Sequence, residues 1–184
     1  MGQELEILEY GTSEEKIKIL GNLESTNDVK IIKKIIGCLD DSDIRVRGEA
    51  FSSLILNKNN VSNFLIESLN DSRKNVRGFG ALVLANRNDT DATSAIINLV
   101  NDESSLVRSC ALGALGYLRA KNAKEIIHKY ILDSNLEVQK SALQALINIE
   151  GEISENEMFE ILKEKDTEIK QLVMKIKKSG PEGI

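Results

Sequence analysis

A short pattern recurs along this chain at a nearly constant spacing, and no other feature restricts its fold as strongly. Each copy has an acidic residue, an anchoring valine or isoleucine five positions later and, in three copies, an arginine next to that anchor. The anchors are 30, 31, 31 and 31 residues apart, at Val46, Val76, Val107, Val138 and Ile169. A fixed period of this length is typical of stacked helical repeats. The period predicts the architecture but names no partner.

Each repeat reads as two helices. In the third repeat, apolar residues at helical spacing fill 62–70, polar residues break the pattern at 70–72, and a second helix follows over 73–86. Asp, Asn and Ser at such junctions suit helix N-caps, because their side-chain oxygens accept free amides of the first turn. The other predicted pairs are 3–9 with 13–23, 28–39 with 43–56, 91–101 with 104–118, 123–132 with 135–149, and a helix after the capping box Ser154–Glu157 with 166–177.

The composition agrees with stacked helices rather than with a β-rich domain. Apolar residues make up 41% of the 184 residues, but aromatic residues only 4%, and there is no Trp. We expect one all-α domain over residues 1–178, a right-handed α-α superhelix of about six helical hairpins and about twelve helices. The expected repeats are 1–25, 26–57, 58–87, 88–119, 120–150 and 151–178, with a frayed tail over 179–184. Lys177 replaces the core leucine of the last repeat, as in a polar end cap.

With these residues laid out, the chain resembles HEAT-repeat proteins, and in particular the short HEAT-like repeats of phycobilin lyases. Such units carry an Asp-x-x-x-x-Val-Arg-x-x-Ala-x-x-x-Leu core. The fourth repeat matches it fully, and the second, third and fifth match with at most one replacement. The matching residues of the fourth repeat are Asp102, Val107, Arg108, Ala111 and Leu115. The resemblance implies an α-solenoid that serves as a binding scaffold.

The repeated Asp and Arg residues have a structural interpretation. An Asp at a helix start accepts backbone amides, and an Arg after the anchor can reach an Asp in its own or the next repeat. Small residues at Ala50, Gly80, Ala111 and Ala142 should stand where neighbouring helices approach most closely. These positions belong to the fold rather than to a site.

The second helices of a HEAT array line its concave side, so their solvent faces are the candidate partner-binding surface. At 100° per residue, the positions opposite each anchor are nearly free of charge, although a solvated face usually carries Glu and Lys. The interpretations are a groove for a peptide or helix, with Phe79, Leu82 and Tyr117 as anchors, or tight packing between crowded helices. The candidate residues are Ser52, Ile55, Leu56, Phe79, Leu82, Asn86, Cys110, Gly113, Tyr117, Gln144, Ile147 and Asn148.

Enzyme and cofactor sites find little support. His128 is the single histidine and stands where other first helices carry Ile, so a structural role is favoured, and one histidine excludes paired His-Glu metal sites. Cys38 and Cys110 are isolated and read as small apolar residues. No phosphate loop or nucleophile motif occurs. The net charge of −5 argues against nucleic acid as a partner, and no stretch could span a membrane.

Two hypotheses about function follow. The first is a non-enzymatic scaffold that binds a protein segment without a cofactor or metal. The second is a chromophore- or substrate-handling protein of the phycobilin-lyase type, which the resemblance implies but no residue identifies. The N-terminal residues lack the apolar run of a signal peptide, so we expect a cytoplasmic protein, and a monomer.

Overall fold

A computed structural model describes residues 2–163 and 166–178 of the chain. These residues form twelve α-helices and three short 3-10 helices, together with one pair of two-residue strands. The prediction of an all-α repeat fold with about twelve helices is therefore confirmed. The chain divides into two compact units, one up to Ala95 and one from Ile96 onward. A single array over 1–178 stays a prediction, and the predicted frayed tail lies outside the described residues.

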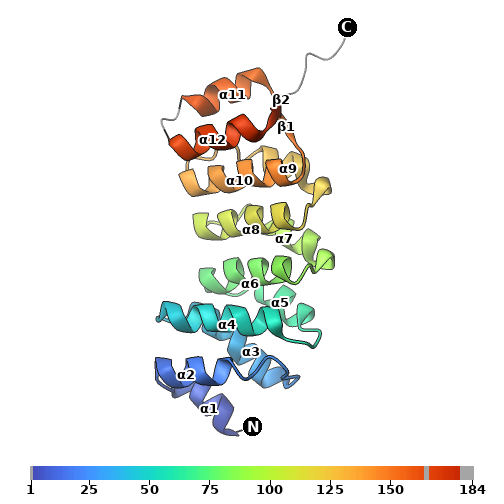
Figure 1. The fold of residues 1–184 in the computed structure, drawn as a ribbon. Coiled ribbons are helices and arrows are strands. Elements are labelled where there is room, and N and C mark those ends of the chain that lie inside the picture. Colours follow the sequence, from blue (N-terminus) through green and yellow to red (C-terminus); the bar gives the residue numbers. More distant parts are fainter. Residues whose placement is uncertain (1, 164–165, 179–184) are drawn as a thin grey trace. The chain divides into compact units, whose positions relative to one another are not determined.

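The first unit consists of alternating first and second helices in two layers (Figure 1). The second helices α2, α4 and α6 pack on one another in chain order, and the first helices α1, α3 and α5 lie beneath them. Each hairpin joins one helix of each layer. The helices are α1 (Gly2–Tyr10), α2 (Ser13–Leu20), α3 (Val29–Gly37), α4 (Ile44–Leu56), α5 (Ser62–Ser68) and α6 (Lys74–Asn86), with 3-10 turns at Cys38–Asp40 and Thr90–Ala92.

The second unit follows the same plan. Helix α7 begins at Thr93, just before the unit boundary, and α8, α10 and α12 pack in chain order as the second helices. The helices are α7 (Thr93–Leu99), α8 (Ser105–Tyr117), α9 (Lys124–His128), α10 (Leu136–Asn148), α11 (Glu155–Leu162) and α12 (Thr167–Lys175), with a 3-10 turn at Lys121–Ala123.

The repeated apolar residues form the core of each unit. The anchors Val46, Val76, Val107, Val138 and Ile169 are all fully buried. So are the leucines eight positions after the first four anchors, which include Leu54 and Leu115. The small residues are also buried, and at Gly80 an added Cβ would stand 3.0 Å from the Ser68 hydroxyl. These apolar side chains recur every four residues along each second helix, so they lie on one face of the helix, and that face is buried.

The predicted capping chemistry occurs at some helix starts but not at all of them, since the N-cap residues of α6 and α8 accept no side-chain hydrogen bond. Thr12 with Glu15, and Ser154 with Glu157, form capping boxes at α2 and α11. The repeated Asp lies two residues before the N-cap and accepts the amide of the N-cap residue. Asp102 accepts the Ser104 amide at 2.8 Å, and the second, third and fifth repeats show the same bond at 2.7–2.9 Å. The Asp therefore orders the turn that feeds each second helix.

The last repeat departs from the prediction. Helix α12 was expected to reach Lys177, and that expectation is wrong. The helix ends at Lys175, because Ile176 takes an extended conformation and its side chain is buried. The next two residues form strand β2 (Lys177–Lys178), which pairs in parallel with β1 (Glu152–Ile153). Backbone pairing, which side-chain periodicity does not reveal, thus ends the final helix.

Candidate binding surface

The structure places the predicted surface residues at different depths. Ser52, Leu56, Asn86, Tyr117, Gln144 and Asn148 are exposed, and Ile55, Phe79, Leu82, Gly113 and Ile147 are half-buried. Cys110 is only 7% exposed, so its side chain offers little surface to a partner. The predicted surface is therefore not uniform. The second helices approach each other more closely in the second unit than in the first.

In the second unit, α8 and α10 form a closed seam, meaning that their facing surfaces meet without a gap. An added Cβ at Gly116 would stand 2.7 Å from the Ala145 Cα, so only glycine allows this approach. The hydroxyls of Ser109 and Ser141 meet at 2.9 Å. Between α8 and α10, the uncharged face of the second helices is therefore occupied by helix packing rather than left open as a groove.

In the first unit, α4 and α6 form an open seam that contains an apolar hollow of about 300 Å³. An added Cβ at Gly48 would meet no atom within 4 Å, so the space above this glycine is empty. Ile44, at the rim, is 71% exposed. The residues that line the apolar hollow are Ile44, Arg47, Gly48, Phe51, Phe79 and Leu82.

Sequence reasoning found two of these lining residues, Phe79 and Leu82, and left the others out of the candidate surface. Ile44 lies two residues before Val46, and the same 100° projection continued backward would have included it. Phe51 lies five residues after Val46, about 140° from it, at the edge of the face that the projection covers.

The repeated arginines bind backbone carbonyls of their own repeat. Arg108 Nη1 donates to the carbonyls of Asp102 and Glu103 at 3.0 and 3.2 Å, and Arg47 and Arg77 make the equivalent bonds. Arg108 also reaches the next repeat, where its Nε lies 3.4 Å from an Asp133 carboxylate oxygen. Gln139, which replaces the arginine in the fifth repeat, still donates to a turn carbonyl, that of Ile131, at 2.9 Å.

Carboxylates at the repeat junctions are held in the charged form. At Asp41, burial raises the pKa. Hydrogen bonds from the Lys16 ammonium and the Asp43 amide lower it by more, so the pKa lies below its ordinary value. At Asp71, hydrogen bonds from the Arg73 side chain lower the pKa and outweigh burial. Asp41 thus pairs with Lys16 of the preceding repeat and Asp71 with Arg73 of its own turn, so the fold rather than catalysis explains both lowered pKa values.

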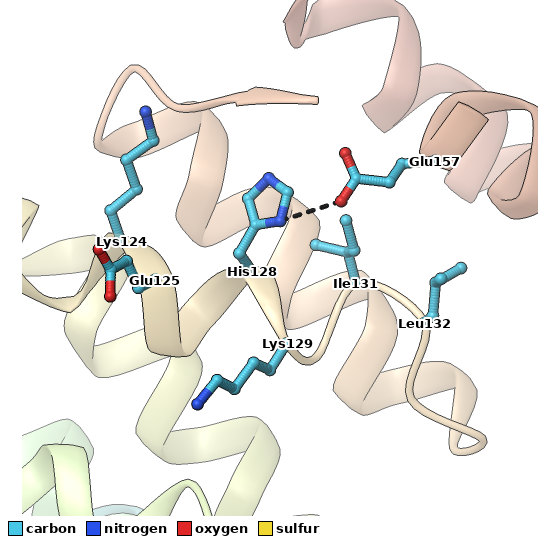
Figure 2. A pocket seen from close by; sticks show the side chains of 7 residues that line it. All are labelled: Lys124, Glu125, His128, Lys129, Ile131, Leu132 and Glu157. Atoms are coloured by element: carbon cyan, nitrogen blue, oxygen red, sulfur yellow. Dashed lines mark ion pairs between the residues drawn. The ribbon is translucent and has the colours of Figure 1, made fainter. Parts of the chain in front are cut away.

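A larger hollow, of about 650 Å³, lies beside His128 on the outer helix α9 (Figure 2). The imidazole Nδ1 lies 3.2 Å from a Glu157 carboxylate oxygen, and Nε2 lies 2.9 Å from the Glu152 carbonyl oxygen. One ring nitrogen thus contacts the first turn of α11, and the other contacts strand β1. Figure 2 shows the amino groups of Lys124 and Lys129 pointing in different directions, neither toward Glu157. His128 joins two repeats, as its structural interpretation predicts.

Three further observations limit the chemistry of the described residues. Burial raises the pKa of the Cys38 and Cys110 thiols to about 11, so neither is poised as a nucleophile. No group of three or more His, Cys, Asp or Glu side chains in the described part of the chain could hold a metal ion. Within that same part, none of the helices has the length and apolar character needed to cross a membrane.

The comparisons with known proteins agree with this architecture. Residues 62–147 match a family described as HEAT repeats. No curated protein matches the sequence. Among solved structures, an engineered protein is 18% identical, with a TM-score of 0.61, and the match covers 94% of this chain and 93% of that chain.

Two other solved structures are similar over most of the chain. A designed armadillo repeat protein in complex with the peptide (KR)4 is 17% identical, with a TM-score of 0.57, covering 94% of this chain and 96% of that chain. The complex of CpcE and CpcF of phycocyanin lyase from Nostoc sp. PCC7120 is also 17% identical, with a TM-score of 0.57, covering 93% and 73%. At these identities the likeness concerns the fold alone.

Proposed function

Because the chain is a HEAT-like repeat protein, we propose that it is a non-enzymatic scaffold that binds a peptide or helix of a protein partner. The binding surface is the exposed face of the second helices α4 and α6 of the first unit, with the apolar hollow at its centre. We place the protein in the cytoplasm as a monomer. No cofactor or metal takes part.

The apolar hollow carries this proposal. Exposed apolar surface that is rimmed by polar residues often marks a site of protein–protein interaction. The volume of about 300 Å³ is at the lower end of the range for ligand pockets, which suits one large side chain of a partner. Aromatic anchors such as Phe79 are typical of the positions that dominate interface energies. A designed armadillo repeat protein of similar fold was solved with a bound peptide, which supports a scaffold role in general.

A capture experiment tests the proposal. The wild-type chain and a Phe79→Ala/Tyr117→Ala variant are immobilised, and the proteins that each retains from native lysate are quantified by mass spectrometry. The proposal expects at least one protein to be retained by the wild type and lost with the variant. Thermal unfolding of both chains separates lost binding from lost folding.

The matched control removes two exposed aromatic residues away from the surface. Tyr10 on α1 is 81% exposed and Phe159 on α11 is 66% exposed, so each unit loses one aromatic side chain, as in the test variant. Tyr10→Ala/Phe159→Ala should retain the same partners as the wild type. Loss of the same partners in this control would contradict the assigned surface, and so would a folded test variant that keeps them.

The second hypothesis, handling of a bilin chromophore, stays a prediction. The likeness to a phycocyanin lyase complex supports it only at the level of the fold. Mixing the chain with a free bilin and recording the visible absorption spectrum tests it directly. An unchanged spectrum would remove this candidate and leave the scaffold proposal untouched.

A further inference from the structure

The apolar hollow lies at a repeat junction that lacks an ion pair found at other junctions of the chain. At two other junctions, the cation at the position of the repeated arginine pairs with the Asp of the next repeat. Lys16 Nζ lies 2.8 Å from an Asp41 oxygen, and Arg108 Nε lies 3.4 Å from an Asp133 oxygen. Arg47 is the equivalent residue of the second repeat. Among the residues that the structure describes, no carboxylate pairs with it.

A single substitution in the pattern accounts for the break. The carboxylate expected for Arg47 belongs to Asp71, but Arg73 of the same turn binds both oxygens of Asp71, at 2.9 and 2.8 Å. The other repeats have Asp43, Ser104 and Asn135 at the position of Arg73, and none of these carries a competing cation. Arg73 thus satisfies Asp71 within its own repeat and leaves Arg47 available.

Arg47 is also held in place. Its Nη1 donates to the carbonyls of Asp41 and Ser42 at 2.8 and 3.1 Å, which fixes the plane of the guanidinium. The N–H groups on Nε and Nη2 form no hydrogen bond within the described part of the chain. These two nitrogens are the pair that binds a carboxylate side-on. The apolar hollow is therefore lined by apolar side chains and by one guanidinium, that of Arg47, which is fixed in orientation and has no carboxylate partner among the described residues.

We propose that the apolar hollow binds an acidic peptide segment, in which a large apolar side chain enters the hollow and a neighbouring Asp or Glu binds Arg47. This inference rests on the proposed scaffold function and names the chemistry of its partner. The protein carries a net charge of −5, so long-range attraction does not favour an acidic partner. Selectivity comes from the local pairing with Arg47, since a basic segment would leave that guanidinium buried beside a like charge.

Peptides selected from a phage-displayed library of random 12-residue sequences test this chemistry without a known partner. The whole chain is the bait. The inference expects the enriched peptides to share a large apolar residue within four positions of an Asp or Glu. In a synthetic copy of the best peptide, Asp→Asn or Glu→Gln should weaken binding about tenfold, as expected for losing one charged hydrogen-bond partner.

The matched protein variants locate the site. Gly48→Leu fills the apolar hollow from within, and it should not disturb the fold, because an added Cβ meets nothing within 4 Å. It should abolish binding of the selected peptides. Asn63→Leu adds the same side chain on the exposed face of α5 and should leave binding unchanged. Arg47→Gln could also weaken the turn that Arg47 caps, so the Gly48 variant and the peptide substitutions carry the test.

The outcomes separate this inference from the function on which it rests. Enriched peptides rich in Lys or Arg, or peptides that bind Gly48→Leu as well as the wild type, would overturn the acidic-segment inference. If such peptides still lost binding with Phe79→Ala/Tyr117→Ala, the scaffold function would stand. Failure to enrich any peptide over an empty support would overturn both.

Discussion

The open seam between α4 and α6 and the closed seam between α8 and α10 are built from the same repeat, but the first contains an apolar hollow and the second brings its two helices into close contact. One difference lies nine residues after each anchor. That position is Gly116 in α8, where an added Cβ would stand 2.7 Å from the Ala145 Cα of α10, and the larger, half-buried Ile55 in α4. Small residues line the closed seam, and Phe51 and Phe79 line the open one.

The charged residues differ between the two seams as well. At the closed seam Arg108 pairs with Asp133 of the next repeat, so the cation is used within the fold. At the open seam Arg73 binds Asp71 and leaves Arg47 without that pairing. The difference teaches that a repeat can keep its core unchanged while two or three positions turn a packing surface into a candidate binding surface.

Replacing a core leucine by alanine should have the largest effect on the free energy of unfolding. The effect should be equal beside the open seam and beside the closed seam. Leu54 and Leu115 are both fully buried at equivalent positions. Each change to Ala should lower the free energy of unfolding by about 2–5 kcal/mol, because a cavity remains in a tightly packed site. Urea unfolding followed by circular dichroism measures this. A much smaller loss for one leucine would mean that the two cores are not equivalent.

Adding a side chain to the glycine of the closed seam should have the next largest effect. Gly116→Val forces the new side chain into the Ala145 backbone, which stands 2.7 Å from an added Cβ. The expected loss of stability is about 1–3 kcal/mol, the usual cost of overpacking. The same urea titration measures it, and an unchanged midpoint would show that this seam is not closed.

The glycine of the open seam should respond in the opposite direction. Gly48→Ala adds a methyl group in empty space within a helix, so the gain is that of replacing glycine by alanine there. The midpoint of thermal unfolding should rise, in line with a gain of about 0.5–1 kcal/mol. A fall in the midpoint would mean that the hollow above Gly48 is filled in solution.

Lowering the pH should have the smallest of these effects on the stability of the fold, through the junction that precedes the open seam. The pKa of Asp41 is lower in the folded chain than its ordinary value, so its charged form stabilises the fold above about pH 4. That contribution is lost as the pH falls through the lowered pKa. Thermal unfolding should therefore shift down between pH 5 and pH 3, and Asp41→Asn should shift less. An equal shift in the variant would remove Asp41 as a source of this pH dependence.

The sequence predicted the repeats and their cores better than the surfaces between them. The anchors at Val46 and Val107 recur with a fixed period, and one buried face per helix suffices to place them. The open seam depends instead on which residue of one helix meets which residue of the next. Gly116 allows the close approach of α10 at the closed seam, and Arg73 binds Asp71 at the open seam. Neither feature is visible in the period. Parallel pairing of β1 with β2 has no side-chain signal at all.

Methyl NMR of the whole chain tests the central claim that the open seam is the binding surface and the closed seam is not. The chain is labelled at isoleucine and leucine methyl groups and titrated with the best peptide from the library selection. The account predicts the largest shifts at Ile44 and Leu82, which line the apolar hollow. Ile147, on α10 of the closed seam, should stay unchanged. Shifts centred on Ile147, with Ile44 and Leu82 unmoved, would contradict it.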